Sequence, residues 1–419
     1  MNITTHFLLP CTLLFLFTAC SSTDEFTGFS YDPAGSTVTS DKEINPQHKR
    51  TIGISRDGIW FSNEAPGTRL NDFYQVNDTL YRAVIKPENH PVNNSPWYSF
   101  KAWSEVPKTI WVELTYEHGT HRYYPDLSYD GKNWFPIDSS AYRPDTTAGT
   151  ALLRLDLAPQ PLWVSAQEIF SSEEYNWWAS NLSQYPFVTR DTVGYSHQNR
   201  PIEKLTITQS NGNQPRGVVI ITSRLHPPEI TGQMAALAFL EEITSESPLA
   251  GQFRNRFEVI AFPFANPDGA DNGHWRHNAA GVDLNRDWTN FNQPETRAIR
   301  NHLQQRMKNN PNLTVYYGID FHSTNENIFY PINRSIDTFP EDFTYTLVDS
   351  IQAAFPKIEF AVEPFDTRSP ITKNWIHRTF GADAVTYEVD DRADRDSLQA
   401  VARKAANLMM KLLIEDESL

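Results

Sequence analysis

The sequence contains very little cysteine. Among 419 residues there are two, Cys11 and Cys20, and both lie within the first 20 positions. We therefore expect the folded part of the chain to contain no disulfide bond. Its stability must then come from a hydrophobic core, and a composition of 39% hydrophobic and 21% charged residues is ordinary for a globular protein.

Positive charge is also scarce. The chain has 36 Lys and Arg against 51 Asp and Glu, which gives a formal net charge of -15. This balance argues against a nucleic-acid partner, because such partners are held mainly through contacts between basic side chains and phosphates. After the N-terminal segment, no apolar stretch is long enough to span a bilayer. The length exceeds that of one average domain.

The N-terminal segment carries a targeting pattern. The apolar run "FLLPCTLLFLF" has the length of a signal peptide and ends in "FTAC", before the polar stretch "SSTDEFTG". It resembles a bacterial lipoprotein signal over residues 1–20, although the first ten residues lack Lys and Arg, and Phe17 stands where Leu is commoner. The resemblance implies lipid attachment at Cys20 and a lipid-anchored place in the cell envelope, with the outer membrane or periplasmic face favoured. An ordinary secretory signal is the alternative.

Two domains are predicted after this signal. Residues 21–50 are polar, and we expect them to be a tether. Residues 51–165 contain short aromatic and β-branched runs separated by turn signals, such as "LYRAVI", "TIWVELTY" and "ALLRLDL". We expect an antiparallel β-sandwich of about seven or eight strands there. From 166 to 419, strand-like and helix-like runs alternate, which predicts a mixed or parallel sheet flanked by helices, with ligands at the strand ends.

A metal-ligand pattern follows one of these strands. In "TSRLHPPEITGQ", His226 and Glu229 stand three residues apart, shortly after the apolar run "GVVIIT". A plain turn into a helix is the alternative interpretation. His322 follows another apolar strand in "YYGIDFHST". Two His and one Glu with an open position suit catalytic zinc, and Asp320 either orients His322 or faces elsewhere.

Other residues suit hydrolysis beside such a metal. A general base is needed, and Glu388 lies in the apolar strand "DAVTYEVDD", where its pKa would rise. Arg276 and Arg286 occur in an Asn- and Gly-rich run, and arginine suits both a carboxylate grip and a developing oxyanion. For each residue taken alone, a surface ion pair or a solvated carboxylate is the alternative. Together they describe a site that hydrolyses an amide next to a free carboxylate.

These motifs resemble the zinc carboxypeptidase family. The matching stretches are "HPPE", "HWRH", "GVDLNRDW", "DFHST" and "TYEVDD", in the order of the family, and the segment that resembles the family is residues 171–415. The run "PFANPDGADNGHWRHNAAGVDLNRDW" most resembles the cytosolic carboxypeptidase-like branch, which carries a β-sandwich ahead of its catalytic domain. The segment "NNSPWYSFKAW" looks like part of that sandwich, so the resemblance extends to residues 51–415.

The resemblance implies a role for each matching residue. One zinc ion per chain would be bound by His226, Glu229 and His322. Glu388 would be the general base and then the proton donor to the leaving amine, and Arg276 would stabilise the oxyanion. Asn285 and Arg286 would hold the C-terminal carboxylate of the substrate.

The same resemblance points to one family residue that is missing here and to one residue that would determine substrate specificity. Where many members carry a mobile Tyr, this chain has no Tyr near Asp366. The usual lid is therefore in doubt, and with it simple exopeptidase activity. The same resemblance would place Lys373 in the pocket for the last side chain of the substrate, where a cation would favour an acidic residue, and a solvated surface lysine is the alternative. Arg368 is a second candidate for that role.

The predicted function is thus a zinc metallocarboxypeptidase that acts on a peptide or small amide. It would meet a membrane only through a lipid anchor, and the sequence does not define the oligomeric state. Two alternatives stay open. One is an N-acyl amino acid deacylase or cell-wall peptide amidase. The other is a non-catalytic envelope lipoprotein that binds glycan or peptide.

Overall fold

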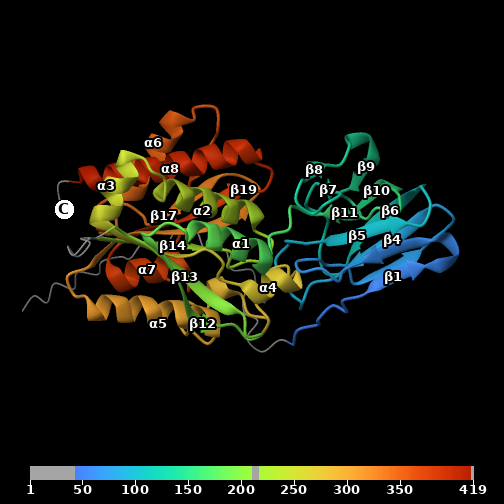
Figure 1. Ribbon diagram of the computed structural model, residues 1–419, viewed down its shortest axis with the longest axis horizontal. Coiled ribbons are helices and arrows are strands. Elements are labelled where there is room, and N and C mark those ends of the chain that lie inside the picture. The colour runs from blue at the N-terminus through green and yellow to red at the C-terminus, as the bar shows by residue number, and fades with distance from the viewer. Residues whose placement is uncertain (1–42, 210–216, 417–419) are drawn as a thin grey trace, which may run out of the picture.

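The structure is a computed structural model that describes residues 43–209 and 217–416. A β-rich part and a larger α/β part lie side by side along the long axis of the molecule (Figure 1). The first part ends with a strand at Ser165, and the second begins with a helix at Ser172. None of the helices in these described ranges has both the length and the apolar character needed to cross a membrane.

The β-rich part contains two sheets, which share one hydrophobic cluster. Their strand orders are β1-β2-β5-β11-β7-β8 and β3-β4-β6-β10-β9. Strand β6 shows why such strands form: Ile110, Val112 and Leu114 alternate along it and are all buried. The strands are β1 (Thr51–Ile54), β2 (Ile59–Ser62), β3 (Asp72–Gln75), β4 (Leu80–Ile85), β5 (Ser99–Ser104), β6 (Lys108–Tyr116), β7 (Asp126–Ser128), β8 (Phe135–Pro136), β9 (Tyr142–Asp145), β10 (Thr150–Leu157) and β11 (Leu162–Ser165).

The pairing in this part differs from the expectation in two ways. Eleven strands are present rather than about seven or eight, because several are only two to four residues long. Strands β4 and β6 pair in parallel, whereas every other pair of the two sheets is antiparallel. The reason is that β5, which lies between them in sequence, belongs to the other sheet. The chain therefore crosses over and returns in the same direction.

The α/β part is built on one eight-stranded sheet of order β12-β13-β15-β14-β16-β19-β17-β18. Its centre is parallel and its edges include antiparallel pairs, so the predicted mixed sheet is confirmed. Every residue of β14 is buried, as expected for a parallel strand covered on both faces. The strands are β12 (Val188–Tyr195), β13 (Pro201–Ile207), β14 (Gly217–Ser223), β15 (Phe257–Phe262), β16 (Thr314–Thr324), β17 (Ile328–Pro331), β18 (Ala361–Val362) and β19 (Asp383–Asp390).

Helices cover both faces of this sheet. One hydrophobic cluster joins the sheet to α1, α2, α3, α6 and α8, and another joins its opposite face to α5 and α7 (Figure 1). A capping box formed by Ser171 and Glu174 fixes the start of α1. The helices are α1 (Ser172–Leu182), α2 (Ile230–Ile243), α3 (Pro248–Arg256), α4 (Pro267–Asn272), α5 (Pro294–Asn309), α6 (Phe343–Ala354), α7 (Thr372–Phe380) and α8 (Arg395–Glu415).

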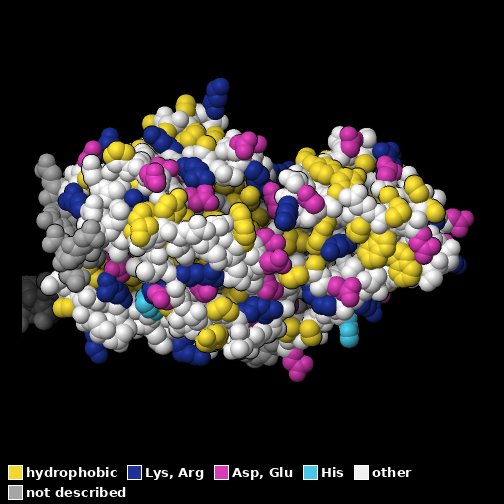
Figure 2. Space-filling view, in the orientation of Figure 1, with side chains coloured by type: hydrophobic (Ala, Val, Ile, Leu, Met, Phe, Trp, Pro, Cys, Tyr) yellow, Lys and Arg dark blue, Asp and Glu magenta, His cyan; other side chains and the backbone are white. Residues whose placement is uncertain are grey.

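The two parts are joined by buried contacts. Trp275, from the loop after α4, is fully buried and belongs to the hydrophobic cluster of the β-rich part. Arg69 of the β-rich part donates a hydrogen bond to the carbonyl of Gly273, 3.1 Å away. On the face shown in Figure 2, acidic side chains gather along this junction. The loop after α4 is therefore held by both parts of the molecule.

Candidate active site

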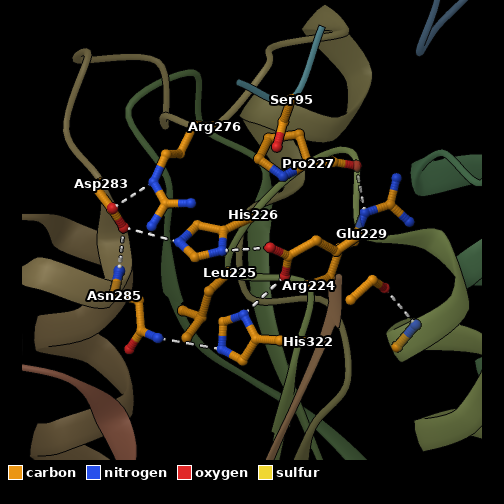
Figure 3. A network of polar contacts seen from close by, with 12 residues as sticks. Ser95, Arg224, Leu225, His226, Pro227, Glu229, Arg276, Asp283, Asn285 and His322 are labelled. Carbon is orange, nitrogen blue, oxygen red and sulfur yellow. Dashed lines mark hydrogen bonds and ion pairs between the residues drawn. The ribbon is translucent and has the colours of Figure 1, made fainter. Parts of the chain in front are cut away.

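Three side chains converge at the carboxyl ends of adjacent parallel strands. His226 and Glu229 lie in the turn between β14 and α2, and His322 lies near the end of β16. Their ligand atoms all lie within 4.8 Å of one another. Glu229 contacts both rings, with Oε1 at 2.8 Å from Nδ1 of His226 and Oε2 at 2.7 Å from Nδ1 of His322 (Figure 3). The structure thus brings the three predicted ligands together.

Carboxylates fix the opposite edge of each imidazole ring. Nε2 of His226 lies 2.9 Å from Asp283, and Nε2 of His322 lies 2.8 Å from Asp320. Both Nδ1 atoms are thereby left to face Glu229. This arrangement fits zinc, which takes imidazole nitrogen and carboxylate oxygen ligands and whose histidines usually donate their other N–H to a carboxylate. Asp320 does face His322, because residues two apart on a strand point to the same side of the sheet.

Glu388 lies beside this ligand set. Strand β19 pairs with β16 so that Glu388 is the partner of His322, and the two side chains therefore project from the same face of the sheet. Its Oε2 atom is buried and has no hydrogen-bond partner among the residues that the structure describes. Burial, together with the nearby charge of Glu229, raises the pKa of Glu388 to about 7. This carboxyl is therefore suited to exchanging a proton near neutral pH.

Arg276 is held next to the ligands by two carboxylates. Its Nε donates to Asp283 at 2.7 Å, and Asp283 also contacts His226, so one carboxylate joins the arginine to the ligand set (Figure 3). The second carboxylate belongs to Glu88 of the β-rich part, which accepts hydrogen bonds from the backbone N–H groups of Trp275, Arg276 and His277 at 2.7–3.0 Å. The backbone that carries Arg276 is thus fixed from the other side of the junction.

Asn285 and Arg286 lie in the short 3-10 helix Leu284–Arg286 and line the same cleft as the ligands. The amide of Asn285 is engaged through its oxygen, whereas its nitrogen faces the ring of His322. Its Oδ1 accepts from the backbone N–H of Thr372 at 2.9 Å, and its Nδ2 lies 3.2 Å from Nε2 of His322. Asn285 therefore holds the start of α7 at the site. Arg286, the next residue, adds a positive charge to the cleft.

Lys373 lies behind the wall of the cleft rather than on it. The residue is 1% exposed, and its ammonium donates to the carbonyl of Pro331 at 3.3 Å. It stands 5.5 Å from the centre of the Phe365 ring, which does line the cleft. Burial lowers the pKa of Lys373 to about 7, although the negative charges of Asp366 and Asp383 oppose this shift.

The position of the missing tyrosine is occupied by a turn. Asp366 is buried and accepts from the backbone N–H of Arg368 at 2.7 Å. A different tyrosine, Tyr330 of β17, lines the cleft and is paired with Thr386 of β19. The side chain of Arg368 is exposed and does not line the cleft.

The cleft has a volume of about 560 Å³. One wall contains the metal-ligand set, Glu388 and the two arginines. The other wall comes from the β-rich part, and Figure 3 shows Ser95 entering the site from that side. Sequence reasoning missed this second wall and also Asp283. In the sequence, Asp283 could have been found only from its position two residues before Asn285, within the motif "GVDLNRDW".

The chain is similar to known proteins. The family model described as "Zinc carboxypeptidase" matches residues 174–411. Cytosolic carboxypeptidase 6 of Caenorhabditis elegans is 28% identical over 177 residues, which cover 40% of this chain and 38% of the worm protein. The chain thus matches less than half the length of that curated relative.

Solved structures share the fold over most of the chain. A metallo-carboxypeptidase from Burkholderia cenocepacia has a TM-score of 0.72 at 18% identity, covering 86% of this chain and 100% of that one. A metallo-carboxypeptidase from Pseudomonas aeruginosa, in complex with (2-guanidinoethylmercapto)succinic acid, has a TM-score of 0.69 at 19% identity. That match covers 85% of this chain and 99% of the other.

Proposed function

The chain belongs to the zinc carboxypeptidase family, and we propose that it is a zinc-dependent metallocarboxypeptidase that removes a C-terminal residue from a peptide. The observation that carries the proposal is the convergence of His226, Glu229 and His322 beside Glu388, in a cleft that also contains Arg276 and Arg286. A structural metal site would need neither the unpaired carboxylate nor the two cations.

Each residue then has a chemical task. His226, Glu229 and His322 would hold the zinc ion, which supplies a Lewis acid that polarises the scissile carbonyl and makes a water molecule easier to deprotonate. Glu388 would accept a proton from the attacking water and return it to the leaving amine, since its raised pKa suits both directions of transfer. The unpaired Oε2 atom is the one available for that proton.

Two cations would meet the negative charges of the reaction. The guanidinium of Arg276, fixed by Asp283, would face the oxyanion as it develops, and a donor fixed in advance needs no reorganisation during the reaction. Arg286 would bind the terminal carboxylate of the substrate. Asn285 would assist through Nδ2 and hold the start of α7 in place, because its Oδ1 is already bonded to Thr372.

We also propose a preference for acidic C-terminal residues, with Lys373 as its source. Because Lys373 lies behind Phe365, its charge would act through space rather than by direct contact. Coulomb attraction at such a distance is weaker than a contact ion pair. We therefore expect a modest selectivity of roughly threefold to tenfold over a neutral residue of similar size, which corresponds to about 0.7–1.4 kcal/mol.

The N-terminal parts of the chain have proposed roles as well. We propose that residues 51–165 form a β-sandwich, which the shared hydrophobic core of the two sheets supports. We propose that Cys20 is acylated and that the protein is anchored in the cell envelope. Cys20 lies outside the described residues, so this proposal depends on the sequence alone.

The proposal is tested with matched peptides that differ only at the C-terminus, one with a free carboxylate and one amidated. The zinc-loaded wild type should release the last residue of the free peptide, and amidation should slow the reaction at least tenfold because Arg286 loses its charged partner. Equal cleavage of both peptides would contradict the exopeptidase assignment and favour an internal amidase.

A further inference from the structure

The β-rich part forms one wall of the cleft. The residues of this wall belong to none of the metal-ligand or catalytic motifs. Two of its loops reach the cleft. The loop after β4 contributes Asn93, Asn94 and Ser95, and the loop after β6 contributes His121 and Arg122. They line the same space as His226 and Glu229.

Among these residues, the side chain of Arg122 is held by the largest set of polar contacts. It forms an ion pair with Asp391, which follows the strand that carries Glu388, and Asp391 is also bonded to Gln167. Nη1 of Arg122 donates to the carbonyl of Asn94 at 3.1 Å and to Oγ of Ser95 at 3.3 Å. Its Nε is buried and has no partner in the described part of the chain. A fixed guanidinium thus keeps one N–H donor unused.

Asn93 provides the complementary atom. Its Oδ1 is buried and likewise has no partner within residues 43–209 and 217–416. The neighbouring polar side chains are already satisfied, since Asn94 bonds to Thr120, and both ring nitrogens of His121 contact tyrosine hydroxyls at 2.8 and 2.9 Å. Both residues line the cleft, so its wall contains one buried donor and one buried acceptor that no described residue satisfies, the pair of groups that a peptide group requires.

The cleft continues past these residues. A second hollow of about 370 Å³ shares Arg122 and Asn325 with it and runs between the β-rich part and the segment after β19. Neither Arg286 nor Phe365, which line the first cleft and are proposed to lie near the C-terminal residue of the substrate, lines this hollow. A chain whose end is held at Arg286 therefore has an open path along Arg122.

We propose that Asn93 and Arg122 form a binding site for the polypeptide backbone upstream of the scissile bond, and that the second hollow accepts further residues of an extended chain. The inference rests on the proposed carboxypeptidase function and narrows its substrate class to polypeptides longer than a dipeptide. Backbone recognition places no demand on the sequence of that upstream chain.

The test measures binding of two peptides that share their last two residues, a dipeptide and a hexapeptide, to the Glu388→Gln protein loaded with zinc. The hexapeptide should bind about tenfold more tightly, as expected for one or two added hydrogen bonds to a fixed site. Arg122→Ala and Asn93→Ala, each made in the Glu388→Gln background, should remove most of this advantage. The control Arg154→Ala, an exposed arginine on β10 that lines neither hollow, should keep it.

A second measurement separates backbone recognition from a merely structural effect. In hexapeptides that are N-methylated at one upstream amide at a time, one position should lose about tenfold in affinity for protein that contains Asn93. The same position should be insensitive in Asn93→Ala. Equal affinities for dipeptide and hexapeptide, or an advantage retained in both variants, would overturn the inference. Turnover by the wild type tests the proposed function separately, because these binding measurements need no hydrolysis.

Discussion

Replacing Glu88 by Gln should destabilise the protein strongly, although Glu88 is remote from the metal ligands in sequence. Its carboxylate is fully buried and accepts three backbone N–H groups: Trp275 on Oε2 at 2.7 Å, and Arg276 and His277 on Oε1 at 3.0 and 2.9 Å. Glutamine has the same size but replaces one acceptor by an NH2 group. In the better of its two orientations, the N–H of Trp275 loses its acceptor.

The magnitude follows from these contacts. One unsatisfied buried donor costs about 1–3 kcal/mol, and each of the two remaining bonds weakens by about 1 kcal/mol when its acceptor loses its charge. The free energy of unfolding should therefore fall by about 3–5 kcal/mol at pH 7. This is a large share of the roughly 5–15 kcal/mol that is typical of a folded protein.

The loss should also depend on pH. Burial alone would raise the pKa of Glu88, but the hydrogen bond with His277 and the charges of His274, His277 and Arg69 outweigh burial and hold it well below its ordinary value. A carboxyl with a lowered pKa in the folded state stabilises the protein above its unfolded pKa of about 4.3. That stabilisation disappears as the pH falls through the folded-state value. The difference between wild type and Glu88→Gln should therefore be largest at neutral pH and shrink below about pH 4.

Urea denaturation at pH 7, 5 and 3.5 measures this difference. The matched control is Glu117→Gln, because Glu117 forms only a half-exposed ion pair with Lys86 and should contribute less than about 1 kcal/mol. Since Glu88 holds the backbone of Arg276, turnover should also fall in Glu88→Gln but not in the control. A Glu88→Gln protein as stable as the control, or a difference that does not change with pH, would refute the reasoning.

Three further predictions concern the metal, specificity and the anchor. His226→Ala and His322→Ala should each lose the stoichiometric zinc found in the wild type by metal analysis, and zinc retained in both would contradict the ligand assignment. Lys373→Met should reduce the preference for Glu over Gln at the substrate C-terminus to about one, by kcat/KM on matched peptides; an unchanged ratio would remove Lys373 as its source. Labelled fatty acid should enter the wild type and not Cys20→Ala, and equal labelling of both would reject that site.

The framework of the α/β part could be predicted from local patterns. Continuous apolar runs marked the buried central strands, and the helix-like runs that alternate with them correspond to helices such as α2 and α8. Because the ligands follow such runs closely, the carboxyl ends of adjacent parallel strands bring His226 and His322 together. Once a strand is recognised, the alternation of its side chains also places Asp320 beside His322.

Other features depend on contacts that local patterns do not encode. The burial of Lys373 depends on how α7 packs against β17, and the sequence indicated only that a cation occurs there. The parallel pairing of β4 with β6 depends on which sheet takes β5. The second wall of the cleft exists because the β-rich part docks on the loop of Trp275. No local pattern around Asn93 or Arg122 indicates that they line the same cleft as Glu229.

The most direct test of the account is the Glu388→Gln variant, with zinc content and peptide hydrolysis measured on the same preparation. The amide keeps the shape of the side chain but cannot accept the proton from the attacking water. The variant should therefore retain one zinc ion per chain and lose about 10²–10⁴-fold in kcat, whereas the exposed control Glu363→Gln should match the wild type. Near-normal turnover by zinc-loaded Glu388→Gln would contradict the central claim that this carboxylate is the general base of a metal-assisted hydrolase.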